Sequence, residues 1–176
     1  MASTLKPESD RLDEARRRRE ERYFQRPPAG ISAETVERLL RAGVDPRVAR
    51  IDLELVKEVT REDTQWSQAQ AELAELEYKR MLTLLLWNPG LPHPIVPARL
   101  VDEIWHHHLL DSRAYHADMQ ALFGDYLHHF PYLGLRTEES RRLKLEAFEL
   151  SCRLYERTFG EPLVDPRWSH ESPSSE

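Results

Sequence analysis

Apolar residues recur at helical spacing along most of the chain, in stretches bounded by residues that favour helix ends. Ser32 favours a helix that continues to about Ala42 and ends before Gly43. Asp45 followed by Pro46 is typical of an N-cap with proline in the first turn, and predicts a helix to about residue 62. The first two helices are therefore short to medium in length.

A third helix is predicted from about Ser67 to Trp87. At 100° per residue one of its faces carries a set of mainly apolar side chains, with a single cation among them: Ala69, Leu73, Leu76, Arg80, Leu84 and Trp87. The far end, "MLTLLLW", is apolar on all sides, which indicates burial against several neighbours. We expect this helix to be central.

Three further helices follow a connector, "NPGLPHPIVP", whose four prolines exclude a long helix or an inner strand. They are expected over residues 98–110, from the N-cap Asp111 to Gly124, and from Thr137 to Gly160. The last has an apolar stripe of Leu145, Phe148, Cys152, Tyr155 and Phe159. No strand pattern is evident, so the sequence predicts an all-α, single-domain irregular bundle of about six helices with disordered termini.

The two ends of the chain have a different composition. Residues 1–30 form a charged, flexible arm that ends in "QRPPAG", residues 31–162 form the helical domain, and residues 163–176 form a disordered tail rich in Ser, Glu and Pro. The arm contains the run "RRRR" (16–19), but acidic residues on both sides nearly cancel its charge.

The composition of the chain disfavours several classes of function. A formal net charge of −6 disfavours general attraction to nucleic acids and anionic lipids. Cys152 is the only cysteine, so neither an intramolecular disulfide nor a thiolate zinc cage can form, which suits a reducing cytoplasm. The longest apolar run, residues 81–87, is too short to cross a bilayer. We expect a cytoplasmic protein without a membrane partner, whose partner is a small molecule or another protein.

Six of the eight histidines lie in one segment, "VDEIWHHHLLDSRAYHADMQALFGDYLHHFPYLG", residues 101–134. This segment resembles the signature of the glycine-rich domain-containing protein-like family, a W-H-x-H-x-L-D-[TS] run followed by Tyr, Asp, F-G and L-H-H-x-P-Y. The matching positions are Asp102, Trp105, His106, His108, Leu110, Asp111, Ser112, Tyr115, Asp118, Phe123, Gly124, Leu127, His128, His129, Pro131 and Tyr132. The resemblance covers about residues 80–162. It supplies candidate residues but no reaction, and the glycine-rich region of longer members is missing.

Helical geometry separates these histidines. In a helix over 98–110, Val101, Ile104, Trp105 and His108 share one face and Asp102 and His106 share another, whereas His107 is expected to face solvent. His106 and His108 differ in direction by about 200°, so a regular helix cannot direct both at one ion.

Asp118 falls on the apolar face of the following helix and needs a partner, either one of the histidines or Arg80. One of His128 and His129 is expected to face inward. His129 is favoured, because Pro131 and Tyr132 anchor the chain just beyond it.

The first hypothesis is a transition-metal site for zinc, iron, manganese or copper, with Asp102, His106, His108, Asp118 and His129 as ligands. Supporting positions are Arg80, Trp105, Asp111, Tyr115, His128 and Tyr132. Whether such a site catalyses a reaction stays open, since no known catalytic motif is present.

Two alternatives remain. The His, Asp and Tyr side chains can instead form a structural hydrogen-bonded network in a non-enzymatic interaction module. The arginine-rich arm, with Tyr23 and Phe24 close by, can alternatively bind RNA, which the net charge disfavours.

Overall fold

The computed structural model describes residues 7–23 and 30–163, and the side chains of the first segment only as far as residue 18. Within these residues the protein has eight α-helices and no strand, so the all-helical prediction is confirmed. The helices are α1 (Glu8–Tyr23), α2 (Ala33–Arg41), α3 (Pro46–Ala49), α4 (Glu54–Thr64), α5 (Gln68–Trp87), α6 (Arg99–Leu110), α7 (Ser112–Phe123) and α8 (Glu138–Phe159).

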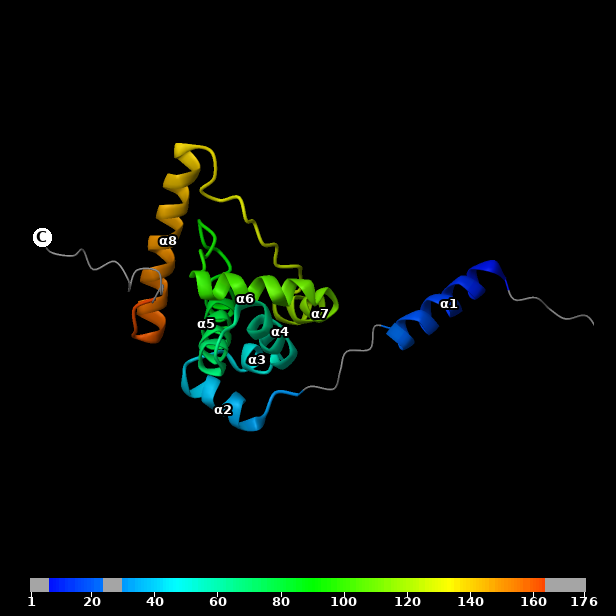
Figure 1. Ribbon diagram of the computed structural model, residues 1–176. Helices are drawn as coiled ribbons and strands as arrows, with labels where there is room; N and C mark the ends of the chain where they lie inside the picture. The colour runs from blue at the N-terminus through cyan, green and yellow to red at the C-terminus, as the bar shows by residue number, and fades with distance from the viewer. Residues whose placement is uncertain (1–6, 24–29, 164–176) are drawn as a thin grey trace, which may run out of the picture.

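Helix α5 lies at the centre of the molecule. In Figure 1 it is surrounded by α6, by α3 and α4 on one side, and by α8 on the other. One hydrophobic core joins side chains of α2 through α8, with Tyr78, Leu82 and Ile104 fully buried. Leu163, which was expected to belong to a disordered tail, packs against this core. The remainder of that predicted tail, residues 164–176, lies outside the described residues.

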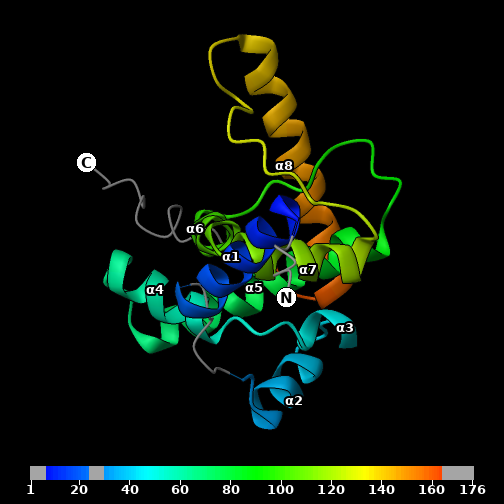
Figure 2. The ribbon, with the colours of Figure 1, turned by 90° about the vertical axis from the view of Figure 1, so that its right-hand side faces the viewer.

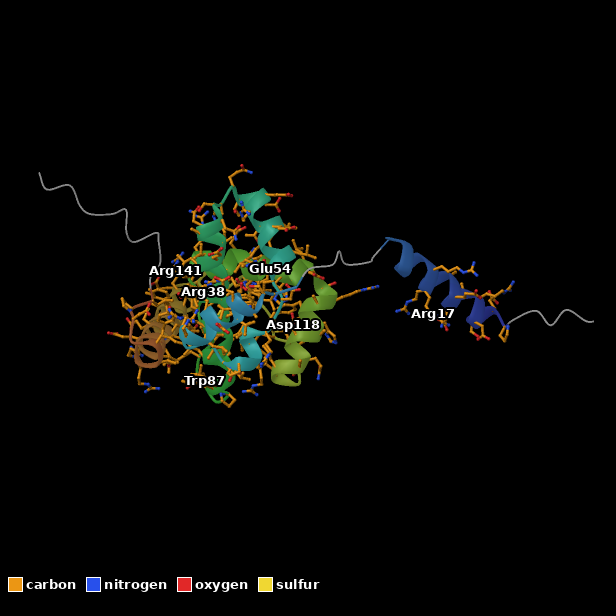
Figure 3. All side chains as sticks on the ribbon, turned by 90° about the horizontal axis from the view of Figure 1, so that it is seen from below. Arg17, Arg38, Glu54, Trp87, Asp118 and Arg141 are labelled. Carbon is orange, nitrogen blue, oxygen red and sulfur yellow. The ribbon has the colours of Figure 1, made fainter. Side chains whose placement is uncertain are left out.

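Helix α1 lies within the predicted arm, and its side chains contribute nothing to the core as far as residue 18, where their description ends. Figures 1 and 3 show it apart from the other helices, with side chains such as Arg17 extending from it. Within the helix, Arg18 pairs with Glu14 at 2.6 Å, so part of the arginine run is neutralised locally. Residues 1–6 and 24–29 of the arm are outside the described residues.

The predicted helix over residues 46–62 is instead two helices, α3 and α4, which is one reason why there are eight helices and not about six. Arg50 to Leu53 leave the helical path, and the carbonyl oxygens of Ala49 and Ile51 accept hydrogen bonds from Lys79 Nζ at 3.3 and 2.7 Å. A continuous helix would use the Ala49 carbonyl internally, so the break satisfies a buried cation of α5.

The predicted buried face of α5 is wrong in the first half of the helix and at its last residue, Trp87, which is 50% exposed. Leu73 is 47% exposed, whereas Glu75 and Lys79 are buried completely. Glu75 Oε1 lies 2.9 Å from Lys79 Nζ, and Glu75 Oε2 lies 2.9 Å from Lys57 Nζ of α4. Because these charges compensate one another, polar residues occupy a face that a hydrophobic pattern assigns to solvent.

These cations also affect the protonation of the buried carboxyl group. Burial alone would raise the pKa of Glu75, but Lys79 and Lys57 together hold the pKa below its usual range. Burial lowers the pKa of Lys79. The ion cluster joins α4 to α5, and a backbone contact extends it to the α3–α4 break.

Helix α8 packs on the core mainly through its second half. Tyr155 and Leu154 are buried, while Leu145 in the first half is 63% exposed, so the predicted apolar stripe is buried only in part. Figure 2 shows the first half of α8 extending beyond the other helices. No helix in residues 7–23 and 30–163 combines the length and apolar character that spanning a lipid bilayer requires.

Candidate functional site

The histidine segment forms α6, α7 and the turn that follows them. Val101, Ile104, Trp105 and His108 are buried on one face of α6, as helical spacing predicted. Asp111 accepts a hydrogen bond from the backbone N–H of Ala114 and so caps α7, and Gly124 ends α7 with a φ of 71°. The turn then brings His129 beside Asp102 of α6.

The five predicted ligand residues separate into two groups on opposite sides of α6. The first, here called the Asp102 cluster, contains Asp102, His106 and His129, and one ligand atom from each lies within 4.8 Å of the others. His129 Nε2 is 2.9 Å from Asp102 Oδ1, and the rings of His106 and His129 have centroids 4.5 Å apart. His129 is 11% exposed and His106 45%, so the cluster lies at the surface with one sheltered side.

The second group, here called the His108 network, is built around His108, which is fully buried. His108 Nδ1 lies 3.0 Å from the Tyr78 hydroxyl, and Nε2 lies 3.2 Å from Asp118 Oδ2. Burial, with a smaller effect of Tyr115 and Asp118, raises the pKa of Tyr78 well above its usual value. The Tyr78 hydroxyl therefore keeps its proton, and hydrogen bonds to Tyr78 and Asp118 engage both ring nitrogens of His108.

Trp105 lies between the two groups. Its Nε1–H donates to the Tyr115 hydroxyl at 3.0 Å, and that hydroxyl donates to the carbonyl oxygen of Leu127. Burial raises the pKa of Tyr115 to about 12 despite the hydrogen bond from Trp105. The ring of Trp105 meets His129 edge-on at 4.6 Å. Trp105 and Tyr115 thus tie α6 and α7 to the turn that carries His129.

Several expectations about individual side chains need correction. Arg80 does not neutralise Asp118: its guanidinium donates to the Ala42 carbonyl and to the Tyr155 hydroxyl, the latter at 2.6 Å. Figure 3 shows Asp118 on α7, away from α8. His107 is not solvent-exposed: its side chain is 8% exposed, and Nε2 lies 3.1 Å from Asp63 Oδ2 of α4.

The turn after α7 orients its two histidines in different directions. His129 faces inward, as its anchored position favoured, while His128 is exposed and contacts Tyr126, with ring centroids 4.8 Å apart. Tyr132 is 63% exposed, and its only ring contact among the described residues is with Phe130. Tyr132 therefore contacts neither group of histidines.

A cavity of about 600 Å³ adjoins the sheltered side of the Asp102 cluster. Asp102, Trp105 and His129 form part of its wall, and the proline-rich connector, the turn and the first half of α8 form the remainder. These three segments lie above α6 in Figure 1. Concave, largely apolar sites of this size are typical of small-molecule binding.

Sequence reasoning missed Tyr78, Asp63 and the carbonyl of Leu127. Tyr78 is 30 residues from His108 and belongs to a different helix, so no local spacing connects the two residues. The only available signal was a tyrosine on a helix expected to be central, since a buried hydroxyl needs a partner. Asp63 is exposed, and the acceptor at Leu127 is a backbone carbonyl. Neither could therefore be recognised as a hydrogen-bond partner from the sequence.

The geometry of the Asp102 cluster suits a cation. His106 Nδ1 lies 2.6 Å from the backbone carbonyl oxygen of Asp102, and since a carbonyl only accepts, Nδ1 donates there and Nε2 is the ring nitrogen that could bind a metal. Two imidazoles and one carboxylate are common ligands of divalent transition metals. The His108 network has its ring nitrogens already occupied, and it lacks this capacity.

The comparisons with known proteins correct the family resemblance. The family model described as UCP032817-like matches residues 46–162, which is more than half of the chain and includes α3 through α8. No curated protein and no solved structure matches. The assignment to the glycine-rich domain-containing protein-like family was wrong: the W-H-x-H and L-H-H-x-P-Y runs lie inside the matched range and are compatible with a different family. The chain belongs to the UCP032817-like family.

Proposed function

We propose that the protein binds one divalent transition-metal ion through Asp102, His106 and His129. The observation that carries this proposal is the convergence of three ligand atoms, from two elements of the fold, within 4.8 Å. His108 and Asp118 are excluded from the ligand set, because they lie on the other side of α6 and satisfy each other. Zinc, iron, manganese and copper are the candidate ions.

Three protein ligands would leave a coordination position for water or a small molecule, as in metal sites with an open position. The cavity beside Asp102 and His129 gives such a molecule access. Metal binding would also displace the proton shared by His129 Nε2 and Asp102 Oδ1, so the affinity should fall with decreasing pH. The geometry supports metal binding and specifies no reaction.

The test is titration of the full-length chain, free of a histidine tag and treated with chelator, with Zn²⁺, Mn²⁺, Fe²⁺ and Cu²⁺ in separate calorimetric experiments. We expect one equivalent of at least one ion to bind. His106→Ala and His129→Ala should each weaken binding at least tenfold, because each removes a ligand. His128→Ala is the matched control, since this histidine is adjacent to His129 but does not belong to the cluster.

Two results would contradict the proposal. One is the absence of stoichiometric binding of all four ions to the folded protein. The other is equal loss of affinity in His128→Ala and His129→Ala, which would indicate general surface binding by histidine. Elemental analysis of the purified protein provides an independent check on the ion present.

A second candidate function follows from the His108 network. Its fully buried imidazole has both nitrogens engaged, as expected of a polar network that specifies how α5, α6 and α7 meet. On this hypothesis the protein is a non-enzymatic interaction module. The two hypotheses then concern different histidines of the segment. The Asp102 cluster would bind a ligand, and the His108 network would fix the packing of the helices. A cytoplasmic location, suited to the single free Cys152, stays a prediction.

A further inference from the structure

The cavity beside the Asp102 cluster differs in charge from the protein as a whole. The chain has a net charge of −6, yet the charged residues that line the cavity are three cations, Arg99, Arg141 and Lys144, and a single carboxylate, Asp102. That carboxylate is hydrogen-bonded to His129. The cavity is therefore locally cationic within an acidic molecule, which favours an anionic ligand.

Two of these cations are available to a ligand. Arg141 pairs with Glu138 at 3.0 Å. Within the described part of the chain, however, neither Arg99 nor Lys144 has a carboxylate within ion-pair distance. The aliphatic stem of Lys144 lies against Gly134, where an added Cβ would approach Lys144 Cδ to 2.6 Å. This packing holds the lysine at the cavity wall and gives Gly134, with its φ of +88°, a specific reason to be glycine.

The other lining side chains are mostly apolar. Trp105, Ile95 and Val96 belong to the well-buried part of the wall, and Phe130, Leu145 and Phe148 to its outer part. Phe130 is 68% exposed, and Leu145 has a similar exposure. Exposed apolar groups beside a concave surface mark binding sites more often than isolated ones do. A ligand with an apolar body would cover them.

The walls are joined by specific hydrogen bonds. The backbone N–H of Val96 in the connector donates to Ser151 Oγ of α8 at 2.9 Å, and the backbone N–H of Gly134 donates to Ser140 Oγ at 2.8 Å. Both the connector and the turn are thus attached to the same helix. These hydrogen bonds hold two walls of the cavity to one helix, and fixed walls lower the entropic cost of binding.

We infer that this cavity binds a small organic anion with an apolar body, such as an aryl or alkyl carboxylate or sulfonate, whose charged group lies near Lys144 and Arg99. The apolar body would lie against Trp105, Ile95 and Phe148. The inference does not depend on a bound metal, because neither cation belongs to the Asp102 cluster.

The test uses two fluorescent probes with the same ring system. Anilinonaphthalene sulfonate carries the anionic group, whereas N-phenylnaphthylamine lacks it. We expect the full-length protein, in the presence of a chelator, to bind the sulfonate at one site and at least fivefold more tightly than the neutral probe. Lys144→Gln and Arg99→Gln should each weaken sulfonate binding about threefold, with little effect on the neutral probe. These changes are those expected for partly exposed charge pairs.

Arg142→Gln is the matched control, because Arg142 is an exposed cation of α8 that pairs with Glu146 and does not line the cavity. Near-ultraviolet circular dichroism must show that all variants are folded, since unfolded surface also binds such probes. Equal affinities for the two probes would overturn the inference, and so would unchanged sulfonate binding in Lys144→Gln and Arg99→Gln. Unchanged sulfonate binding in His106→Ala would separate this site from the proposed metal site.

Discussion

His106 and His108 are two residues apart on α6, and the structure assigns them different environments. His108 is fully buried and bonded to Tyr78 and Asp118, whereas His106 is half-exposed beside His129. We predict that His108→Ala lowers the free energy of unfolding by about 2 to 4 kcal/mol, because it leaves a cavity and an unpaired Tyr78 hydroxyl. His106→Ala should cost less than about 1 kcal/mol.

Urea unfolding and metal titration on the same two variants check this prediction. The folded His108→Ala variant should keep the metal stoichiometry of the parent protein, while His106→Ala loses metal and keeps most of its stability. A His108→Ala variant that is as stable as the parent, or that is folded but unable to bind metal, would contradict the separation of the two groups.

A second residue-scale prediction concerns the buried ions of α5. Lys79→Met removes the cation that Glu75 and two backbone carbonyls share, so the free energy of unfolding should fall by about 3 to 5 kcal/mol. The double variant Glu75→Gln, Lys79→Met should lose less than the sum of the two single variants, because the ion pair between Glu75 and Lys79 can be lost only once. Denaturant unfolding of the three variants measures this coupling, and strictly additive losses would argue against it.

Helix ends could be predicted from the sequence because their signals are local. Ser32, Asp45, Asp111 and Thr137 all act as side-chain N-caps, as expected. The break between α3 and α4 could not be predicted, because its cause, the Nζ of Lys79, comes from a residue about 30 positions away. The same distinction applies to the site: spacing on α6 separated His106 from His108, but the partner Tyr78 lies on another helix.

The N-cap of α3 gives a prediction about pH at the level of the element. Asp45 accepts hydrogen bonds from Arg47 and from Trp87 Nε1 of α5, and mainly the Arg47 side chain lowers the pKa of Asp45 to about 2. Because the folded-state pKa lies below the unfolded value of about 3.9, the stabilisation is present above pH 4 and is lost as the pH falls towards 2.

Asp45→Asn should therefore be less stable than the parent by about 1 to 2 kcal/mol at pH 6, and the difference should shrink as the pH is lowered from 4 to 3. Urea unfolding at these three pH values measures it. Glu37→Gln is a suitable control, since Glu37 is exposed and its ion pair with Arg41 lies at the surface. A constant difference between parent and Asp45→Asn at all three pH values would contradict the role of the carboxylate charge.

At the scale of the whole molecule, the range matched by the family model differs from the range of residues that builds the hydrophobic core. The match begins at residue 46, after α2 has ended. Yet α2 contributes Leu39 to the core with no exposed surface, and the carbonyl of Ala42 after it accepts two hydrogen bonds from Arg80. Residues 7–18 of the arm contribute nothing to the core.

This difference leads to predictions for two truncated chains. Removal of residues 1–30 should change the free energy of unfolding by less than about 0.5 kcal/mol and leave metal binding intact, because the side chains of residues 7–18, the described part of the arm, contribute nothing to the core. Removal of residues 1–45 should abolish cooperative unfolding or lower stability by more than about 4 kcal/mol, since it exposes the surface that Leu39 covers and removes the Ala42 carbonyl that accepts two hydrogen bonds from the buried Arg80. Thermal and urea unfolding of both truncated chains would decide, and equal stability of the two would mean that the matched range folds without α2.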